Sequence, residues 1–164
     1  MARLGYNDMR GAVKEIMDGV GDALVITSVG TISREVFAYK DRPENMYIMG
    51  AMGCALGVGI GLAMNTEKMV VVIAGDGDML MGMGTLALLN WLVQQKGLRN
   101  IRVYIIDNHS YAATGGQQTC STGVAFDSMA PCEVVYVRPE KTSAPRIALT
   151  PVKIWERFCD AVAR

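Results

Sequence analysis

Short apolar runs alternate along the chain with longer segments in which apolar side chains recur at helical spacing. The short runs, rich in β-branched residues, predict strands over residues 23–28, 47–49, 69–74, 101–106 and 134–137. The other segments predict helices over residues 9–20, around 34–37, and over 55–64, 85–95 and 151–162. Strands that alternate with helices indicate an α/β fold, here a doubly wound, mostly parallel sheet with helices on both faces.

Residues that start or stop helices support these boundaries. Asn7 is suited to cap the first helix and Gly19 to end it. Gly97 stops the helix at 85–95. Thr150 followed by Pro151 is a typical beginning for the last helix.

Three features describe the organisation of the chain. The run at 69–74 is apolar throughout, which is typical of a strand covered on both faces, so we expect it at the centre of the sheet. Residues 1–164 contain no repeat or low-complexity linker, and we expect a single domain. Residues 109–127 form a long polar loop, and a loop of this length within a compact domain is usually either functional or disordered.

Composition excludes several classes of protein. With 16 Lys and Arg, 16 Asp and Glu and one His, the formal net charge is zero, which argues against nucleic-acid binding through phosphate contacts. Hydrophobic residues make up 51% of the chain, which argues against disorder. The four cysteines form no Cys-x-x-Cys pair, so we expect free thiols in a cytoplasmic protein. A mean hydropathy of +0.22 indicates a surface that faces a partner.

Residues 46–64 carry no charge over 19 positions, about the length of a membrane-spanning helix. Five glycines interrupt this segment and a strand-like run follows it directly, so we expect part of the α/β domain and no membrane span. The first residues carry charge with no apolar stretch behind them, and we expect no cleavable leader.

Oxygen-bearing side chains follow two predicted strands. Gly75-Asp76-Gly77-Asp78 comes after the strand at 69–74, and Asp107-Asn108 ends the strand at 101–106. Neighbouring parallel strands end at the same edge of a sheet, where α/β proteins bind ligands, so we expect Asp76 and Asn108 to lie together. With a main-chain carbonyl such as that of Ser110 they suit Mg²⁺, which commonly shares its coordination with phosphates. Gly77 would expose N–H groups to such a phosphate.

Two other interpretations of this region stay open. Gly82-x-Gly84-x-x-Ala87 fits a relaxed dinucleotide-binding fingerprint with Asp107 as its acidic partner. These glycines begin eight residues after the strand, however, and the acids at 76 and 78 would repel a pyrophosphate without a metal. The remaining interpretation is an acidic turn and a polar strand end that bind no ligand.

The motifs together resemble a known family. Gly75-Asp76-Gly77 and Asp107-Asn108 are similar to the thiamine diphosphate motif. The segments TSVGTISREVFAYKDR, MGAMGCALGVGIGLA, GDGDMLMGMGTLALL and DNHSYAATGGQQT resemble the diphosphate-binding domain of the phosphonopyruvate and sulfopyruvate decarboxylases, and they cover most of residues 25–119. The resemblance implies the diphosphate-binding (β) subunit of a two-subunit 2-oxo acid decarboxylase that depends on thiamine diphosphate and Mg²⁺.

The resemblance also implies roles for individual residues. Asp76, the side chain of Asn108 and the carbonyl of Ser110 would bind Mg²⁺. The residues implied to bind the cofactor are Gly50, Met52, Gly75, Gly77, Asp78, Thr31 and Tyr111. Among them, the Gly50 carbonyl would meet the aminopyrimidine amino group, and the Met52 side chain would support the bent shape of the cofactor. His109 is a candidate proton donor, and the loop at 109–127 would close over the substrate.

A second chain is implied as well. In the resembled family, a glutamate on a separate pyrimidine-binding domain protonates the aminopyrimidine, and nothing in these 164 residues can hold that domain. We therefore expect a pyrimidine-binding (α) subunit that supplies the catalytic Glu, in an α2β2 or larger assembly. The substrate would be a small 2-oxo acid, a sulfo- or phosphono-substituted pyruvate, converted to the aldehyde and carbon dioxide.

Two departures from the family pattern leave the substrate open. Cys54 stands where relatives commonly have His, and His109 stands where a small residue is frequent. One alternative is a subunit of another thiamine diphosphate enzyme, a carboligase or an oxidoreductase. The other is a non-catalytic, nucleotide-binding α/β module.

Overall fold

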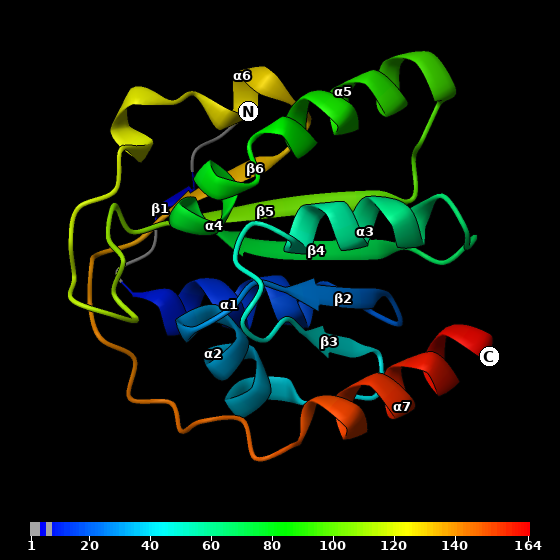
Figure 1. The fold of residues 1–164 in the computed structure, drawn as a ribbon, viewed down its shortest axis with the longest axis horizontal. Coiled ribbons are helices and arrows are strands. Elements are labelled where there is room, and N and C mark those ends of the chain that lie inside the picture. Colours follow the sequence, from blue (N-terminus) through cyan, green and yellow to red (C-terminus); the bar gives the residue numbers. More distant parts are fainter. Residues whose placement is uncertain (1–3, 6–7) are drawn as a thin grey trace.

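Within residues 4–5 and 8–164, which the computed structural model describes, six strands form one sheet in which every neighbouring pair is parallel (Figure 1). The strands are β1 (Leu4–Gly5), β2 (Leu24–Thr27), β3 (Asn45–Tyr47), β4 (Val70–Gly75), β5 (Ile101–Asp107) and β6 (Glu133–Tyr136). Their order across the sheet is β1-β6-β5-β4-β2-β3. The strand order therefore reverses between β2 and β4.

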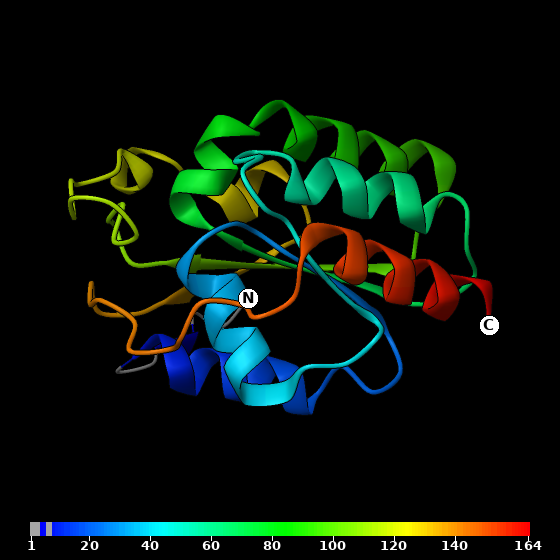
Figure 2. The ribbon, with the colours of Figure 1, turned by 60° about the horizontal axis from the view of Figure 1, so that its bottom comes forward.

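Helices cover both faces of this sheet, and the predicted doubly wound α/β architecture is confirmed (Figure 2). The helices are α1 (Met9–Asp18), α2 (Thr31–Lys40), α3 (Ala55–Ala63), α4 (Asp76–Met81), α5 (Gly84–Lys96), the 3-10 turn η1 (Ser121–Gly123), α6 (Phe126–Met129) and α7 (Pro151–Ala163). Helices α1 and α2 pack on one face, whereas α3 and α5 pack on the other. Helix α7 lies along the β3 edge.

β4 shows how the sequence produces two cores. Its alternate side chains Val70, Val72 and Ala74 belong to the core under α3 and α5. Val71 and Ile73 belong to the core under α1 and α2. Both faces of the strand are therefore covered, and its residues from Val70 to Ala74 are all apolar, as predicted for a central strand.

The helix boundaries follow from capping residues. Asn7, the predicted first cap, lies outside the described residues, and Asp8 caps α1 by accepting a 2.7 Å hydrogen bond from the Gly11 N–H. Gly97 ends α5 in the left-handed conformation, as predicted. The predicted start of α7 is also confirmed, since the Thr150 side chain accepts from the Lys153 N–H.

The structure corrects several predicted boundaries. The strand predicted at 47–49 lies at 45–47. The prediction missed its start because Asn45 is polar, and this side chain is buried in the strand with its amide hydrogen-bonded to Lys40 and Tyr47. The residues after β4, predicted as a turn, begin helix α4. The predicted loop at 109–127 contains η1 and the start of α6. β1 is two residues long and was not predicted.

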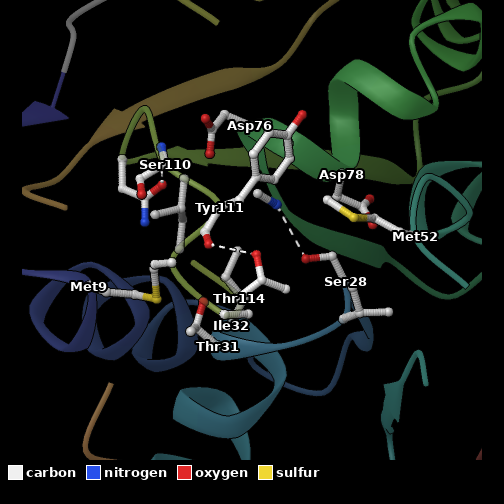
Figure 3. A pocket seen from close by; sticks show the side chains of 17 residues that line it. Met9, Ser28, Thr31, Ile32, Met52, Asp76, Asp78, Ser110, Tyr111 and Thr114 are labelled. Carbon is white, nitrogen blue, oxygen red and sulfur yellow. Dashed lines mark hydrogen bonds between the residues drawn. The ribbon is translucent and has the colours of Figure 1, made fainter. Parts of the chain in front are cut away.

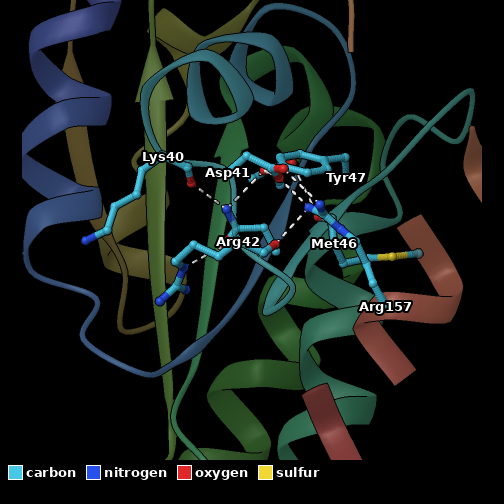
Figure 4. Close-up of polar contacts among 8 residues, drawn as sticks. Lys40, Asp41, Arg42, Met46, Tyr47 and Arg157 are labelled. Atoms are coloured by element: carbon cyan, nitrogen blue, oxygen red, sulfur yellow. Dashed lines mark hydrogen bonds and ion pairs between the residues drawn. The ribbon is translucent and has the colours of Figure 1, made fainter. Parts of the chain in front are cut away.

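A polar network, which we call the edge network, fixes α7 to the β3 edge (Figure 4). It consists of Asp41, Arg42, Asn45, Tyr47 and Arg157. The Arg157 guanidinium donates two hydrogen bonds to the Asp41 carboxylate, one of them at 2.8 Å, and a third at 2.8 Å to the Arg42 carbonyl. The Tyr47 hydroxyl donates to Asp41 at 2.8 Å and accepts from Asn45 at 3.0 Å. Helix α7 is thereby held against the segment that joins α2 to β3.

The uncharged segment at 46–64 is divided between the end of β3, an irregular stretch and the nine-residue helix α3. Among the described residues, no helix has the length and apolar character needed to cross a membrane.

Candidate functional site

A cavity of about 170 Å³ opens at the carboxyl ends of β2, β4 and β5, next to the point where the strand order reverses (Figure 3). This is where open α/β sheets bind ligands. Nine of the eleven predicted site residues line it: Thr31, Met52, Gly75, Asp76, Gly77, Asp78, Asn108, Ser110 and Tyr111. Gly50 and His109 do not. Because ligand pockets usually measure about 300–1,000 Å³, this chain encloses only part of a cofactor-sized site.

The end of β4 positions the acidic side of the cavity. Gly75 is both the last residue of the strand and the residue that precedes α4, so the chain turns directly from strand to helix. Asp76 and Asp78 fall in the first turn of that helix, and both are buried. The neighbouring β2 stabilises this turn, because the Gly75 N–H donates to the Ser28 hydroxyl at 3.2 Å.

Asp76 is 2% exposed and lies close to a second buried carboxylate, that of Asp107. The Thr119 hydroxyl donates to Asp76 Oδ2 at 2.5 Å. Burial raises the pKa of Asp76; the hydrogen bond from Thr119 opposes this rise and the charge of Asp107 adds to it. Among the described residues, none of the ion pairs includes Asp76. A cation bound here would relieve the repulsion between the two carboxylates.

Asn108 and Ser110 lie beside Asp76, because β5 pairs with β4 in parallel and both strands end at this edge. Asn108 is buried, and its Oδ1 accepts a 3.0 Å hydrogen bond from the Ser110 N–H. Ser110 in turn pairs with Gln118 across an antiparallel bridge. The structure thus brings the three predicted metal ligands, a carboxylate, an amide and a carbonyl-bearing residue, to one cavity wall.

Met52 and Tyr111 form an apolar part of the cavity lining, and their packing against the start of α4 depends on Gly77. A Cβ at Gly77 would lie 2.5 Å from Cε1 of Tyr111 and 3.1 Å from Cε of Met52, so only glycine lets both side chains contact the backbone at the start of α4. Figure 3 shows the Tyr111 ring reaching across the cavity between Asp76 and Met52. Thr31, the first residue of α2, lines the opposite end of the cavity.

The segment that carries Met52 is held against α4. The Gly53 N–H donates to Asp78 Oδ1 at 2.9 Å, and burial, only partly opposed by this hydrogen bond, raises the pKa of Asp78. Gly53 has φ +86°, and its backbone contacts the backbone of Gly82. A Cβ at Gly82 would clash with the Gly53 carbonyl oxygen, whereas a Cβ at Gly53 would be strained by the positive φ and crowded at 3.1 Å from the Gly82 nitrogen. Gly50, with φ +72°, lies exposed at the start of the same segment.

His109 lies in the loop after β5, but its ring is directed away from the cavity lining. Its Nδ1 is 2.7 Å from the Ser121 hydroxyl and 2.9 Å from Asp107 Oδ1, and the ring is tilted against Tyr136. With φ +54° it is the one described non-glycine residue at positive φ. Its predicted role as a proton donor stays a prediction.

Several residues of this region escaped the sequence prediction. Thr119 and Ser121 form buried hydrogen bonds to Asp76 and Asp107 beside the predicted metal ligands, and Ser28 supports the turn after β4. The signal for Thr119 was present in the GGQQT segment, but a sequence motif does not say which side chain a hydroxyl will contact.

The alternative fingerprint at 82–87 is explained differently. Gly82 ends α4 and Gly84 begins α5, so these glycines form a helix–helix junction and do not follow a strand. Gly82 is needed for the contact with Gly53. The described residues contain no group of three or more His, Cys, Asp or Glu side chains that could hold a metal. Asp76, Asn108 and Ser110 offer a carboxylate, an amide oxygen and a carbonyl, and these three oxygen donors fit a cation such as Mg²⁺ that also binds oxygens of a ligand.

Comparison with known proteins decides the family. The model of the thiamine pyrophosphate enzyme family, C-terminal TPP binding domain, matches residues 28–143. The chain belongs to this family. Thiamine pyrophosphate is another name for thiamine diphosphate, so the resemblance drawn from the motifs is confirmed, and the matched range contains all eleven predicted site residues.

The chain is also similar to individual family members. It is 30% identical to the sulfopyruvate decarboxylase subunit beta of Methanocaldococcus jannaschii, over 93% of this chain and 95% of that protein. The corresponding subunit of Methanococcus maripaludis is 30% identical over 93% and 96%. The phosphonopyruvate decarboxylase of Streptomyces viridochromogenes is 39% identical, but the match covers 66% of this chain and 26% of that protein. The same domain thus accounts for nearly all of some relatives and a part of others.

Proposed function

We propose that this chain is the diphosphate-binding subunit of a two-subunit 2-oxo acid decarboxylase that acts on sulfo- or phosphono-substituted pyruvate. The observation that carries the proposal is the convergence of Asp76, Asn108 and Gly77 at the adjoining ends of β4 and β5, in a chain of the thiamine pyrophosphate enzyme family. The names of the relatives support the substrate class. The four free thiols of the described chain fit a reducing compartment, and we include a cytoplasmic location in the proposal.

The residues divide the work as follows. Asp76, Asn108 and the Ser110 carbonyl hold Mg²⁺, and the N–H groups of Gly77 and Asp78 face the diphosphate next to Gly75. Met52 supports the cofactor from its apolar side, the Gly50 carbonyl orients the aminopyrimidine, and Thr31 and Tyr111 contact the cofactor from the other walls. Asp78 holds the Met52 segment in place through the Gly53 N–H.

When bound, thiamine diphosphate supplies the electron sink for the carbon–carbon bond that breaks as carbon dioxide leaves. This chain orients the group, excludes water from its apolar side with Met52 and Tyr111, and balances the diphosphate charge through the metal. A pyrimidine-binding partner subunit, in an α2β2 or larger assembly, supplies the glutamate for the ring nitrogen. The small cavity supports this division, because the chain encloses less volume than a whole cofactor needs.

Calorimetry with thiamine diphosphate and MgCl2 tests the proposal, first on this chain and then on its complex with the partner. We expect binding that requires both components and that Asp76→Ala weakens at least about 100-fold, since it removes the charged ligand. Asp22→Ala, which removes an exposed carboxylate, is the matched control and should bind like the wild type. Binding that is absent, or equal in the Asp76→Ala variant, would contradict the proposal.

The substrate is tested on the complex by product analysis with sulfopyruvate, phosphonopyruvate and pyruvate. We expect aldehyde and carbon dioxide from one of the two anionic substrates and little turnover of pyruvate. Carboligation or electron transfer to an acceptor would favour the alternative reactions of the family. Binding of a nucleotide in place of thiamine diphosphate would favour a non-catalytic module.

A further inference from the structure

A row of polar side chains within hydrogen-bonding distance of one another, which we call the site network, runs from Asp76 through Thr119, Ser121 and Asp107 to His109. The Thr119 hydroxyl lies 2.5 Å from Asp76 Oδ2 and 3.0 Å from the Ser121 hydroxyl. The Ser121 hydroxyl lies 2.9 Å from Asp107 Oδ1 and 2.7 Å from His109 Nδ1. All but His109 are buried. The row therefore connects the predicted metal ligand to the loop that follows β5.

The donors in this row have defined directions. An ionised carboxylate only accepts hydrogen bonds, so each hydroxyl must turn its single hydrogen towards its own carboxylate. Thr119 thus donates to Asp76, at the shortest distance in the row, and Ser121 donates to Asp107. Hydrogen bonds to charged acceptors are the strong ones, so both hydroxyls are held in a single orientation.

The backbone makes Thr119 a rigid support. Its N–H donates to the His109 carbonyl at 3.0 Å, and the preceding residue, Gln118, pairs with Ser110. A further hydrogen bond runs from the Tyr111 N–H to the Gln117 carbonyl at 2.8 Å. The two arms of the loop are therefore closed on each other, and Thr119 cannot move without disturbing Ser110.

We propose that Thr119 is a positioning residue for the cation: by engaging Oδ2 of Asp76 it fixes the carboxylate and leaves Oδ1 for Mg²⁺. This inference rests on the proposed function. Mg²⁺ requires nearly ideal octahedral geometry, whereas Ca²⁺ accepts irregular and variable coordination. A carboxylate released from Thr119 therefore loses affinity for Mg²⁺ more than for Ca²⁺, and the hydroxyl at 119 sets the preference between them.

The experiment measures the affinity of the full chain for MgCl2 and for CaCl2 at a fixed, saturating concentration of thiamine diphosphate by calorimetry. Thr119→Val keeps the shape and removes the hydroxyl, and we expect it to lower Mg²⁺ affinity about tenfold or more, the typical effect of losing a hydrogen bond to a charged group, and Ca²⁺ affinity by less than about threefold. Thr119→Ser keeps the hydroxyl and should restore the wild-type preference. Thr122→Val, an exposed position in the same loop, is the matched control.

The outcomes separate this inference from the proposed function. If Asp76→Ala abolishes cation binding while Thr119→Val leaves the preference for Mg²⁺ unchanged, or weakens both cations equally, Thr119 has a merely structural role and the inference is wrong. If the wild-type chain binds neither cation with thiamine diphosphate, either alone or in its complex with the partner, the proposed function itself is wrong. If Thr119→Val does not fold, Thr119→Ala, which also removes the hydroxyl, takes its place with the same expected and contradicting outcomes.

Discussion

The edge network and the site network each hold an aspartate carboxylate, that of Asp41 partly exposed and that of Asp76 buried, and they shift its pKa in opposite directions. At the edge, burial raises the pKa of Asp41, and hydrogen bonds from Arg157 and Tyr47 outweigh this effect, so the net pKa is lowered. At the site, the pKa of Asp76 is raised, because burial and Asp107 outweigh the hydrogen bond from Thr119. At Asp41 the chain itself provides the positive charge, through Arg157. At Asp76 it provides a hydroxyl and amides but no positive charge, and a bound cation would supply that charge.

The largest effect on the fold is expected at the edge. Arg157→Leu removes the three hydrogen bonds that the guanidinium donates to Asp41 and to the Arg42 carbonyl, and we expect the free energy of unfolding to fall by about 2 kcal/mol. Urea denaturation at pH 7 measures it. Lys153→Leu removes the cation of an exposed pair, 3.7 Å from Glu156 on the same helix, and should change stability by less than about 0.5 kcal/mol. Equal losses in the two variants would show that the edge network adds nothing beyond a surface pair.

The same substitution should act with opposite sign in the two networks. Asp76→Asn removes a buried negative charge beside Asp107, so we expect the metal-free chain to gain about 1 kcal/mol of stability at pH 7 while it loses Mg²⁺ binding. Asp41→Asn should lower stability, because it removes the acceptor of Arg157. The urea midpoints of both variants, measured in EDTA, check this. A loss of stability in Asp76→Asn would contradict the contrast drawn between the networks.

The smallest effect is on the pH dependence of stability. The raised pKa of Asp76 means that the folded state holds this proton more tightly than the unfolded chain does. The contribution of Asp76 to the free energy of unfolding therefore declines as the pH rises above about 4. The lowered pKa of Asp41 gives the opposite pH dependence. Its contribution to the free energy of unfolding is complete above the ordinary carboxyl pKa and is lost as the pH falls through the lowered pKa. Urea midpoints measured from pH 3 to 7 check both. Asp76→Asn should reduce the decline in stability towards neutral pH, and Asp41→Asn should reduce the loss of stability at acid pH. Superimposable profiles would contradict both assignments.

The sequence was sufficient for the parts of the site that local patterns determine. The uniformly apolar run before Gly75 placed β4 at the centre of the sheet, and the rule that neighbouring parallel strands end together brought Asp76 to Asn108. The glycines near Met52 and at Gly77 were recognised through the family motifs, and the structure supplies the reason for Gly77, namely the contact with Tyr111.

The remaining features depend on contacts between distant residues. Thr119 meets Asp76 across 43 positions and Arg157 meets Asp41 across 116, and no periodicity encodes such pairs. Asn45 interrupts the apolar pattern of β3, and its side chain is satisfied by the Lys40 carbonyl, the Arg42 guanidinium and the Tyr47 hydroxyl. Prediction from this sequence therefore failed for polar contacts that neither a strand end nor a family motif marks.

The contact between Gly53 and Gly82 has a consequence for protein engineering. Two backbones that touch without side chains between them leave no room for adjustment, so the Met52 segment and α4 form one mechanical part. A graft of residues 50–53 into another scaffold would need the end of α4 with it. The transferable unit is this pair of segments, which are separated in sequence by the whole of α3 and β4.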